Sequence, residues 1–253
     1  MTAYLDNNIF IYIENQTLST ADLLKNVSLD IKDFFYSASH LQEANEMTAD
    51  NDFELSARLK TRFSTISEVT RNNYLYQELA TKKVHKLIER PSVVFDTINE
   101  VKSTQSAMKQ MVNTLSEKQK EEFRKHLNVD SARLNNYNPK EVIEHINQKS
   151  GLLDGYSFLG LIERAIEIHP QGKQMSLHNR VAGVFEILDM MGYWKDKFTS
   201  KSNYARLWDG SHTYFSSFCD YFISDDRNTR NKAKVAFEIY GVDTKVISSK
   251  GIE

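Results

Sequence analysis

The sequence is poor in cysteine, proline and glycine, and each shortage excludes a class of structure. The single cysteine, Cys219, excludes an internal disulfide and favours a reducing compartment, the cytoplasm. Three prolines and nine glycines are too few for many short strands joined by tight turns, so long helices are favoured. No apolar run reaches the roughly 18 residues of a membrane span, and no signal-like segment opens the chain. We therefore expect a cytoplasmic protein without membrane contact.

An excess of one charge sign is also missing. The 32 Lys and Arg residues nearly balance the 34 Asp and Glu residues, which gives a formal net charge of -2. Such a chain is not a general binder of nucleic acid, so contact with RNA or DNA must depend on local basic patches. The 253 residues, 40% of them hydrophobic, suffice for one large domain or for a domain with a big insertion.

The first eight residues carry the strongest signal of a site. Tyr4-Leu5 predicts a short strand that runs into Asp6, and a helix over Ile9–Glu14 follows. Open α/β sheets place their ligands at the carboxyl ends of strands, so Asp6 is a candidate site residue. The plainer alternative is that Asp6 only caps the helix after it.

Two later segments, 34–47 and 209–226, offer partners for Asp6. Phe34–Ser37 predicts a second strand, which leads into a helix that carries Glu43. A helix that begins at Asp209 leads into a third strand, Tyr221–Ser224, and two further acids follow that strand. Acids that follow strands or begin helices recur in the α/β parts of the chain, so we expect them to lie near Asp6.

The end of the chain returns to an α/β pattern. Arg227–Tyr240 predicts a helix rich in Arg and Lys, and Gly241 is its expected cap. Thr244–Ile247 predicts a final strand.

The middle of the chain has a different sequence pattern, with apolar residues at helical spacing, and we expect it to be helical throughout. Apolar spacing and capping signals mark the segments 53–69, 83–89, 101–115, 116–126, 140–148, 152–166 and 181–191. Ser116 opens a capping box, and Pro139 stands at a first helical position. We therefore assign residues 1–50 and 203–253 to an α/β domain, and residues 51–202 to an all-helical insertion packed on the same core.

The acids of the α/β parts form a candidate metal site of Asp6, Glu43, Asp209 and either Asp225 or Asp226. Four carboxylates brought together repel one another unless a divalent cation neutralises them. Oxygen ligands favour Mg²⁺ or Mn²⁺ over structural zinc. Such a site suits phosphodiester hydrolysis, because the metal activates water and stabilises charge on the phosphate.

Three motifs in this order resemble the PIN-domain ribonucleases. Residues 4–11, Tyr-Leu-Asp-Asn-Asn-Ile-Phe-Ile, are similar to their opening strand, acid and helix. Residues 35–43, Phe-Tyr-Ser-Ala-Ser-His-Leu-Gln-Glu, are similar to their second strand and acid-bearing helix. Asp-Gly-Ser-His at 209–212 and Cys-Asp-Tyr-Phe-Ile-Ser-Asp-Asp-Arg at 219–227 complete the pattern. The resemblance covers roughly residues 1–48 and 205–248.

The resemblance implies a three-layer α/β/α fold with a central parallel sheet and an endoribonuclease activity. The implied catalytic and metal-binding acids are Asp6, Glu43, Asp209 and Asp226. Asp226 fits the third position of the segment Ser224-Asp-Asp, where the resemblance implies an acid, and Asp225 is its competitor. Asn8 would orient Asp6 or the attacking water, and Ser224 would hydrogen-bond a carboxylate.

Other polar residues have both a site interpretation and a structural one. His212 lies one helical turn after Asp209 and is expected to support the site from outside the metal shell. Arg227, Arg230 and Lys232 follow Asp226, so they could hold the substrate backbone, or form a solvated helix face. The chain departs from compact family members in the long separation between Glu43 and Asp209.

Two rival functions remain open. One is a catalytically inactive PIN-like interaction module, and the other is a structure-specific DNA nuclease. By analogy, small nucleases of this type act as toxins or in defence, held in check by an inhibitory protein. The helical insertion could dock such a partner, cap the site or form a homodimer.

Overall fold

The computed structural model describes residues 1–98, 116–169, 172–196 and 200–251. The chain forms two compact units. The first contains Met1–Gln105, Phe215–Asp226 and Thr244–Glu253, and the second contains Ser106–Tyr214 and Arg227–Asp243. The helix expected over residues 101–115 lies outside the described residues.

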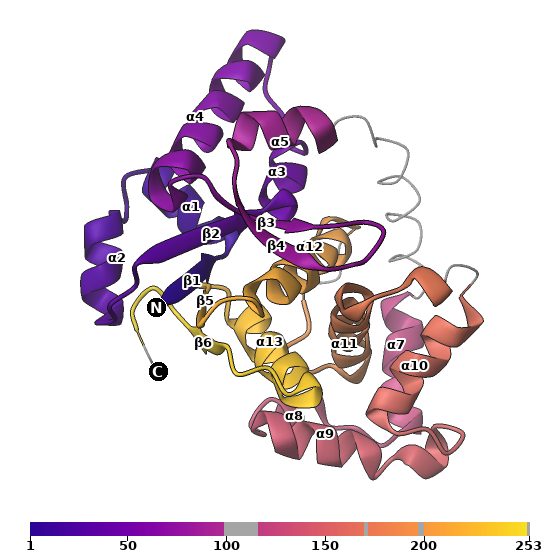
Figure 1. The fold of residues 1–253 in the computed structure, drawn as a ribbon. Helices are drawn as coiled ribbons and strands as arrows, with labels where there is room; N and C mark the ends of the chain where they lie inside the picture. Colours follow the sequence, from indigo (N-terminus) through magenta and orange to yellow (C-terminus); the bar gives the residue numbers. More distant parts are fainter. Residues whose placement is uncertain (99–115, 170–171, 197–199, 252–253) are drawn as a thin grey trace. The chain divides into compact units, whose positions relative to one another are not determined.

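A six-stranded sheet in the order β4-β3-β2-β1-β5-β6 forms the centre of the first unit. Its strands are β1 (Thr2–Leu5), β2 (Asp33–Ser37), β3 (Asn73–Gln77), β4 (Val84–Ile88), β5 (Tyr221–Ile223) and β6 (Lys245–Ile247). Neighbouring strands are parallel except β3 and β4, which form an antiparallel hairpin. The central strand β1 therefore ends at the same edge as its neighbours β2 and β5 (Figure 1).

Both faces of the central strands β1, β2 and β5 are buried. Ala3 and Leu5 of β1 belong to an apolar core on one face. Tyr4 pairs in register with Phe35 and Phe222 on the neighbouring strands, and all three side chains are buried. Because side chains alternate along a strand, these rings lie on the face opposite Ala3 and Leu5. Parallel sheets buried on both faces are characteristic of α/β folds, so the predicted three-layer α/β/α class is confirmed.

The helices of the first unit cover the face of Ala3 and Leu5. They are α1 (Asn7–Glu14), α2 (Thr20–Val27), α3 (Ala38–Ala44), α4 (Asp52–Thr70) and α5 (Pro91–Ile98). Phe10 of α1, Ile66 of α4 and Phe95 of α5 join the apolar core of that face. Helix α1 begins directly after β1, which fixes Asp6 between a central strand and a buried helix.

The prediction that residues 52–201 contain no strand is wrong. The segment 83–89, expected as a helix, contains β4, and β3 precedes it in the chain. All five residues of β3 pair with β4, from Asn73 opposite Ile88 to Gln77 opposite Val84. This pairing outweighs the local helical pattern, because strand formation depends on cross-strand partners that lie elsewhere in the sequence. The first unit accordingly continues to Gln105, past the expected boundary at residue 50.

The second unit is helical in its described part. Its helices are α7 (Glu117–His126), α8 (Ser131–Leu134), α9 (Pro139–Asn147), α10 (Phe158–Ile168), α11 (Leu177–Met191) and α13 (Arg227–Tyr240), with 3₁₀ turns η2 (Ser150–Leu152) and η3 (Gly172–Gln174). Helix α12 (Ser200–Ser216) begins in the second unit and ends in the first. The capping box at Ser116, Pro139 at the start of α9 and the left-handed Gly192 after α11 confirm the predicted helix limits.

Helix α11 lies at the centre of the second unit, where it contacts α7, α10 and α13. Its apolar side chains are buried, and it also carries the buried Asp189, which accepts a hydrogen bond of 2.6 Å from the Lys120 ammonium. Burial raises the pKa of Asp189, but the nearby Arg206, Lys120 and Lys232 lower it more, so the net pKa is below its usual value. None of the helices in the described ranges is long and apolar enough to cross a membrane.

Candidate functional site

The Asp6 carboxylate lies at the carboxyl end of β1 and is only 4% exposed. Its Oδ1 accepts a hydrogen bond of 2.8 Å from the Asn7 N–H. Its Oδ2 accepts 2.6 Å from the Asn8 amide and 2.5 Å from the Ser224 hydroxyl. An acceptor-only group with three donors aimed at it is what an ionised carboxylate needs when it is removed from water.

Ser224 joins the ends of two parallel strands. The backbone N–H of Asp6 donates to the Ile223 carbonyl over 2.8 Å, which brings the residue after β5 beside the residue after β1. The Ser224 hydroxyl donates to Asp6 and accepts from the Asn8 amide over 3.2 Å. We expected Ser224 to hydrogen-bond a carboxylate and Asn8 to orient Asp6. In the structure, both side chains donate a hydrogen bond to the Asp6 carboxylate.

The two acids after Ser224 have different surroundings. The Asp225 carboxylate accepts 2.8 Å from the Ser249 N–H and 2.6 Å from the Ser249 hydroxyl. Asp225 therefore fixes the segment after β6 to the end of β5. Asp226 is exposed, and its N–H donates to the Ser224 hydroxyl over 3.1 Å. This arrangement favours Asp226 over Asp225 as the candidate acid after β5.

Glu43 lies on α3, the helix that follows β2, and is partly buried. Burial raises the pKa of Tyr4 well above its usual value, and the charges of Asp6 and Glu43 both raise it further. Both carboxylates are therefore close enough to act on the same phenol.

His40 is fully buried and structural. Its Nδ1 accepts from the Ser37 N–H over 3.1 Å, which completes a capping box at the start of α3. Its Nε2 then carries the proton and donates to the Leu5 carbonyl over 2.8 Å. The imidazole therefore fixes the end of β1 to the start of α3, and so holds the segment before Asp6 against the helix of Glu43.

Asp209 and His212 belong to the second unit. Both lie on α12, where Asp209 is partly buried and His212 is fully buried. The structure therefore divides the four acids between the units, with Asp6, Glu43 and Asp226 in the first and Asp209 in the second. His212 has the burial of a packed histidine.

The three basic residues expected to hold substrate differ in exposure. Arg227 is exposed and lies over the Trp194 ring, 4.4 Å from its centroid. Arg230 is buried on α13. The Lys232 ammonium is 1% exposed and donates to Asp196 over 2.8 Å. Contact with a substrate phosphate therefore does not fit Lys232, because its charge is already neutralised inside the second unit.

The candidate acids have the oxygen ligands that suit Mg²⁺ or Mn²⁺, but the described residues do not form a complete ligand shell. Carboxylate oxygens are the ligands that these hard cations prefer. Within the described ranges, no three His, Cys, Asp or Glu side chains lie close enough together to hold a metal ion. The Ser224 hydroxyl donates to the Asp6 carboxylate and accepts from the Asp226 N–H. We call these three residues the Asp6 corner, and it is the most complete part of the expected set.

Sequence patterns did not identify Ser249, and they left His40 with both a packing and a site interpretation. Ser249, which holds Asp225, follows the last strand and carries no pattern that marks it. The role of His40 has a sequence signal, because Ser37 and His40 have the spacing of a capping box.

Comparison of this chain with models of protein families, with curated proteins and with solved structures gave no match. The resemblance to PIN-domain ribonucleases therefore rests on the sequence motifs quoted above.

Proposed function

We propose that this protein is a metal-dependent endoribonuclease that hydrolyses phosphodiester bonds of RNA. One observation carries the proposal: a nearly buried carboxylate, Asp6, ends the central strand and is oriented by Asn8 and Ser224 from opposite ends of the sequence. Ligand sites of open α/β sheets lie at this edge. The PIN-like motifs supply the reaction class and the nucleic-acid substrate.

The proposed ligands of Mg²⁺ or Mn²⁺ in the first unit are Asp6, Glu43 and Asp226. When bound, the cation supplies positive charge that acidifies water and neutralises the phosphate. Asn8 and Ser224 keep the Asp6 carboxylate in one orientation, and the exposed Asp226 lies where a phosphate can approach from solvent. In the reaction, a water oxygen bonds to phosphorus while the bond from phosphorus to the leaving ribose oxygen breaks. The water loses a proton, and the leaving oxygen gains one.

A second candidate function is a non-catalytic interaction module. It is favoured by the same contacts, because Asp6 is also the N-cap residue of α1 and accepts the Asn7 N–H. A carboxylate engaged by three protein donors is what a purely structural cap would look like. The two candidates differ in whether the corner binds a divalent cation.

The test is a calorimetric titration of Mn²⁺ into the full chain, with an RNA cleavage assay on the same samples. We expect the wild type to bind Mn²⁺ and cleave RNA, and the variant Asp6→Asn/Asp226→Asn to lose both. Single-stranded RNA, single-stranded DNA and branched DNA compared side by side identify the substrate. Faster cleavage of branched DNA would overturn the RNA assignment and favour a structure-specific DNA nuclease.

The matched control is Asp225→Asn. Its carboxylate contacts Ser249 in the structure, so this variant should keep Mn²⁺ binding and cleavage at most of the wild-type level. A wild type that binds no Mn²⁺ would contradict the nuclease proposal and support the interaction module.

The setting of the reaction is also part of the proposal. We place it in the cytoplasm, because one cysteine cannot form an internal disulfide, and such cysteine usage suits a reducing compartment. By analogy with small PIN-type nucleases, an inhibitory protein partner would restrain the activity in a toxin or defence role.

A further inference from the structure

The β3–β4 hairpin carries a local excess of positive charge. With its two flanks it spans residues 71–90, which contain two Glu residues and five basic ones: Arg71, Lys82, Lys83, Lys86 and Arg90. The whole chain, in contrast, has 32 Lys and Arg residues against 34 Asp and Glu residues. A chain of this overall charge can bind a polyanion only through such a local patch.

Two of these positive charges, Lys82 and Lys83, lie in the turn between β3 and β4. Neither forms an ion pair with another described residue, and Lys83 is exposed. The one acid of the turn, Glu78, is engaged within the hairpin. Its carboxylate accepts a hydrogen bond from the Thr81 hydroxyl and lies 3.7 Å from His85 Nε2. The two ammonium groups of the turn are therefore available to an anion from outside.

Two exposed rings lie beside these lysines on one face of the hairpin. Tyr76 and His85 pair directly in the β3–β4 register, so their side chains share a face, with ring centroids 6.4 Å apart. Tyr76 is 39% exposed, and the His85 side chain is 46% exposed. Lys83 precedes His85 by two residues and continues the ladder, since its carbonyl accepts the Glu78 N–H. Exposed rings beside exposed lysines are the combination that holds unpaired bases and their phosphates.

The tip of the hairpin lies at the same edge of the sheet as Asp6. The β1–β2 register, continued to the strand ends, places Asp6 level with Ser37, which pairs with Leu75 of β3. Tyr76 and the turn follow Leu75, so they extend beyond this level. Adjacent strands lie about 4.8 Å apart, so β3 is roughly 10 Å from β1. One extended strand of nucleic acid can therefore reach both the hairpin tip and the Asp6 corner.

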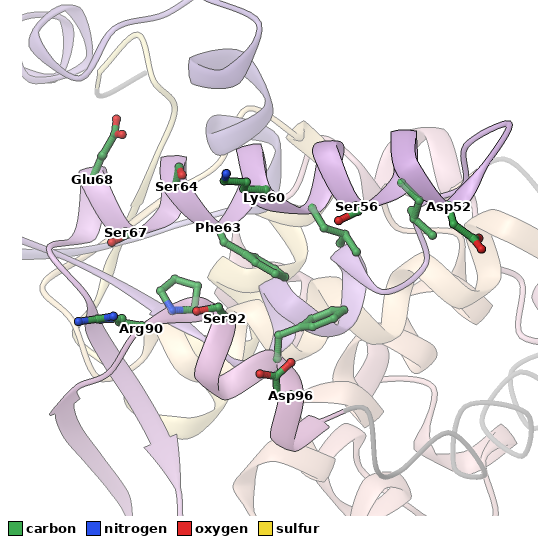
Figure 2. Close-up of a pocket in the computed structure, with 14 residues that line it drawn as sticks. Asp52, Ser56, Lys60, Phe63, Ser64, Ser67, Glu68, Arg90, Ser92 and Asp96 are labelled. Atoms are coloured by element: carbon green, nitrogen blue, oxygen red, sulfur yellow. The ribbon is translucent and has the colours of Figure 1, made fainter.

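A pocket of about 710 Å³ between α4 and α5 has a different character (Figure 2). Its lining includes the apolar rings of Phe63 and Phe95, whose centroids are 4.9 Å apart. The charged residues that line it have both signs: Lys60, Arg90, Asp52, Glu68 and Asp96. The mixed charge of this pocket does not favour a polyanion, whereas the charge of the hairpin does.

We propose that the hairpin tip, formed by Tyr76, Lys82, Lys83 and His85, binds a single-stranded nucleic acid. The two rings stack on an unpaired base, and the two ammonium groups contact neighbouring phosphates. A duplex does not suit this surface, because its bases are already stacked on one another. The inference rests on the proposed function only for the choice of RNA as the strand. With that function, the tip holds the RNA that the Asp6 corner cleaves.

The test is fluorescence anisotropy of labelled single-stranded RNA and DNA oligonucleotides of one mixed sequence, titrated with the full chain in EDTA. Without divalent metal, binding is measured in the absence of cleavage. Tyr76→Ala should raise the Kd by roughly 5- to 150-fold, which corresponds to the loss of one stacked base. Tyr76→Phe keeps the ring and should bind as the wild type does. Thermal melts check that each variant is folded.

The salt dependence of binding tests the lysines. Lys82→Gln/Lys83→Gln removes two phosphate contacts, so the slope of log K against log salt should become shallower by about 1.4. The matched control is Lys25→Gln/Lys32→Gln, which makes the same change of charge at two exposed lysines of the first unit outside the hairpin. The control should keep the wild-type slope and Kd.

The proposal and the nuclease function fail in different measurements. Asp6→Asn/Asp226→Asn should bind the oligonucleotides in EDTA as tightly as the wild type, so hairpin-dependent binding without any cleavage would support this proposal alone. Tighter binding of RNA than of DNA would support RNA as the strand. Tyr76→Ala with the wild-type Kd, or equal affinity for duplex RNA, would overturn the proposal. A wild type that binds neither oligonucleotide would also overturn it, and would favour a protein partner at Leu79, which is 79% exposed in the turn.

Discussion

At the scale of single residues, the candidate site depends on short hydroxyl contacts to carboxylates. The Ser224 hydroxyl donates to Asp6, and the Ser249 hydroxyl donates to Asp225. The two contacts differ in whether a backbone donor also holds the carboxylate. Asp225 also accepts the Ser249 N–H, which no side-chain substitution removes. The contact that ties the Asp6 carboxylate to the end of β5 comes from the Ser224 side chain, which a substitution can remove.

This difference predicts unequal costs for two serine-to-alanine variants. Ser224→Ala removes a hydrogen bond to a buried carboxylate and should lower the free energy of unfolding by about 1.5–3 kcal/mol. Ser249→Ala should cost roughly half as much, because the backbone donor stays in place. Urea denaturation at neutral pH measures both values. Equal costs would show that Ser224 does not hold Asp6 in the manner described.

His178 of the second unit makes stability depend on pH. Its Nε2 lies 3.0 Å from the Ser211 hydroxyl oxygen, and its ring stacks on Tyr214 at an interplanar angle of 16°. Desolvation lowers its pKa from 6.5 to about 4. The unfolded chain therefore takes up a proton at a higher pH than the folded chain does.

The sign of this effect follows from the lowered pKa. The contribution of neutral His178 is complete above pH 6.5 and is lost as the pH falls toward 4. The full shift corresponds to about 3 kcal/mol, and the loss should be smaller because part of the residue surface is exposed. Urea denaturation at several pH values should show a shallower decline for His178→Phe than for the wild type. Identical pH profiles would contradict the assignment.

At the scale of helices, two left-handed glycines end α11 and α13 in different surroundings. Gly192 has φ +81°, and a Cβ placed there would lie 2.2 Å from the Ser131 hydroxyl oxygen. Gly241 has φ +62°, and a Cβ placed there would meet no described atom within 4 Å. Both positions need a left-handed backbone, but only Gly192 also needs the space of a missing side chain.

A pair of glycine-to-alanine variants separates these two requirements. Gly241→Ala should lower the free energy of unfolding by about 1–2 kcal/mol, the cost of a left-handed alanine. Gly192→Ala should cost a further 1 kcal/mol or more, roughly, because the clash with Ser131 adds to that term. Thermal or urea denaturation of the two variants in parallel provides the comparison. A larger cost at Gly241 would show that the space around Gly192 can adjust.

At the scale of the whole molecule, the chain passes between the two units at four points. The candidate acids are divided in the same way, with Asp209 in the second unit and the other three in the first. Both tryptophans, Trp194 and Trp208, belong to the second unit, so their fluorescence reports on that unit alone. A chain threaded in this manner is expected to unfold cooperatively, because neither unit is a continuous segment.

Cooperative unfolding predicts a metal effect on both units. Mn²⁺ at one hundred times its dissociation constant stabilises the folded state by about 2.7 kcal/mol. For a chain of this size, that corresponds to a rise in Tm of roughly 5–10 °C. Tryptophan fluorescence should show the rise in the wild type and no rise in Asp6→Asn/Asp226→Asn. A rise seen by circular dichroism but absent from tryptophan fluorescence would mean that the units unfold separately.

The sequence by itself determined those features whose causes are local. Asp6 follows β1 and caps α1, because the strand, the acid and the helix are consecutive in the chain. The capping boxes at Ser37 and Ser116, the proline that opens α9 and the glycine that ends α11 follow from backbone groups within one turn of each other. The strands β1, β2, β5 and β6 near the two ends of the chain were visible for the same reason.

The tertiary structure alone decided everything that depends on partners distant in sequence. The segment 83–89 is a strand because β3 pairs with it, although its own spacing predicted a helix. Asp225 and Asp226 are consecutive acids that the sequence alone cannot tell apart. The position of Ser249 distinguishes them, because Ser249 binds the Asp225 carboxylate and leaves Asp226 as the candidate ligand. Lys232 belongs to a basic run in the sequence, yet Asp196 neutralises it inside the second unit. Local patterns cannot encode such pairings, because each partner's position is fixed by the packing of the whole chain.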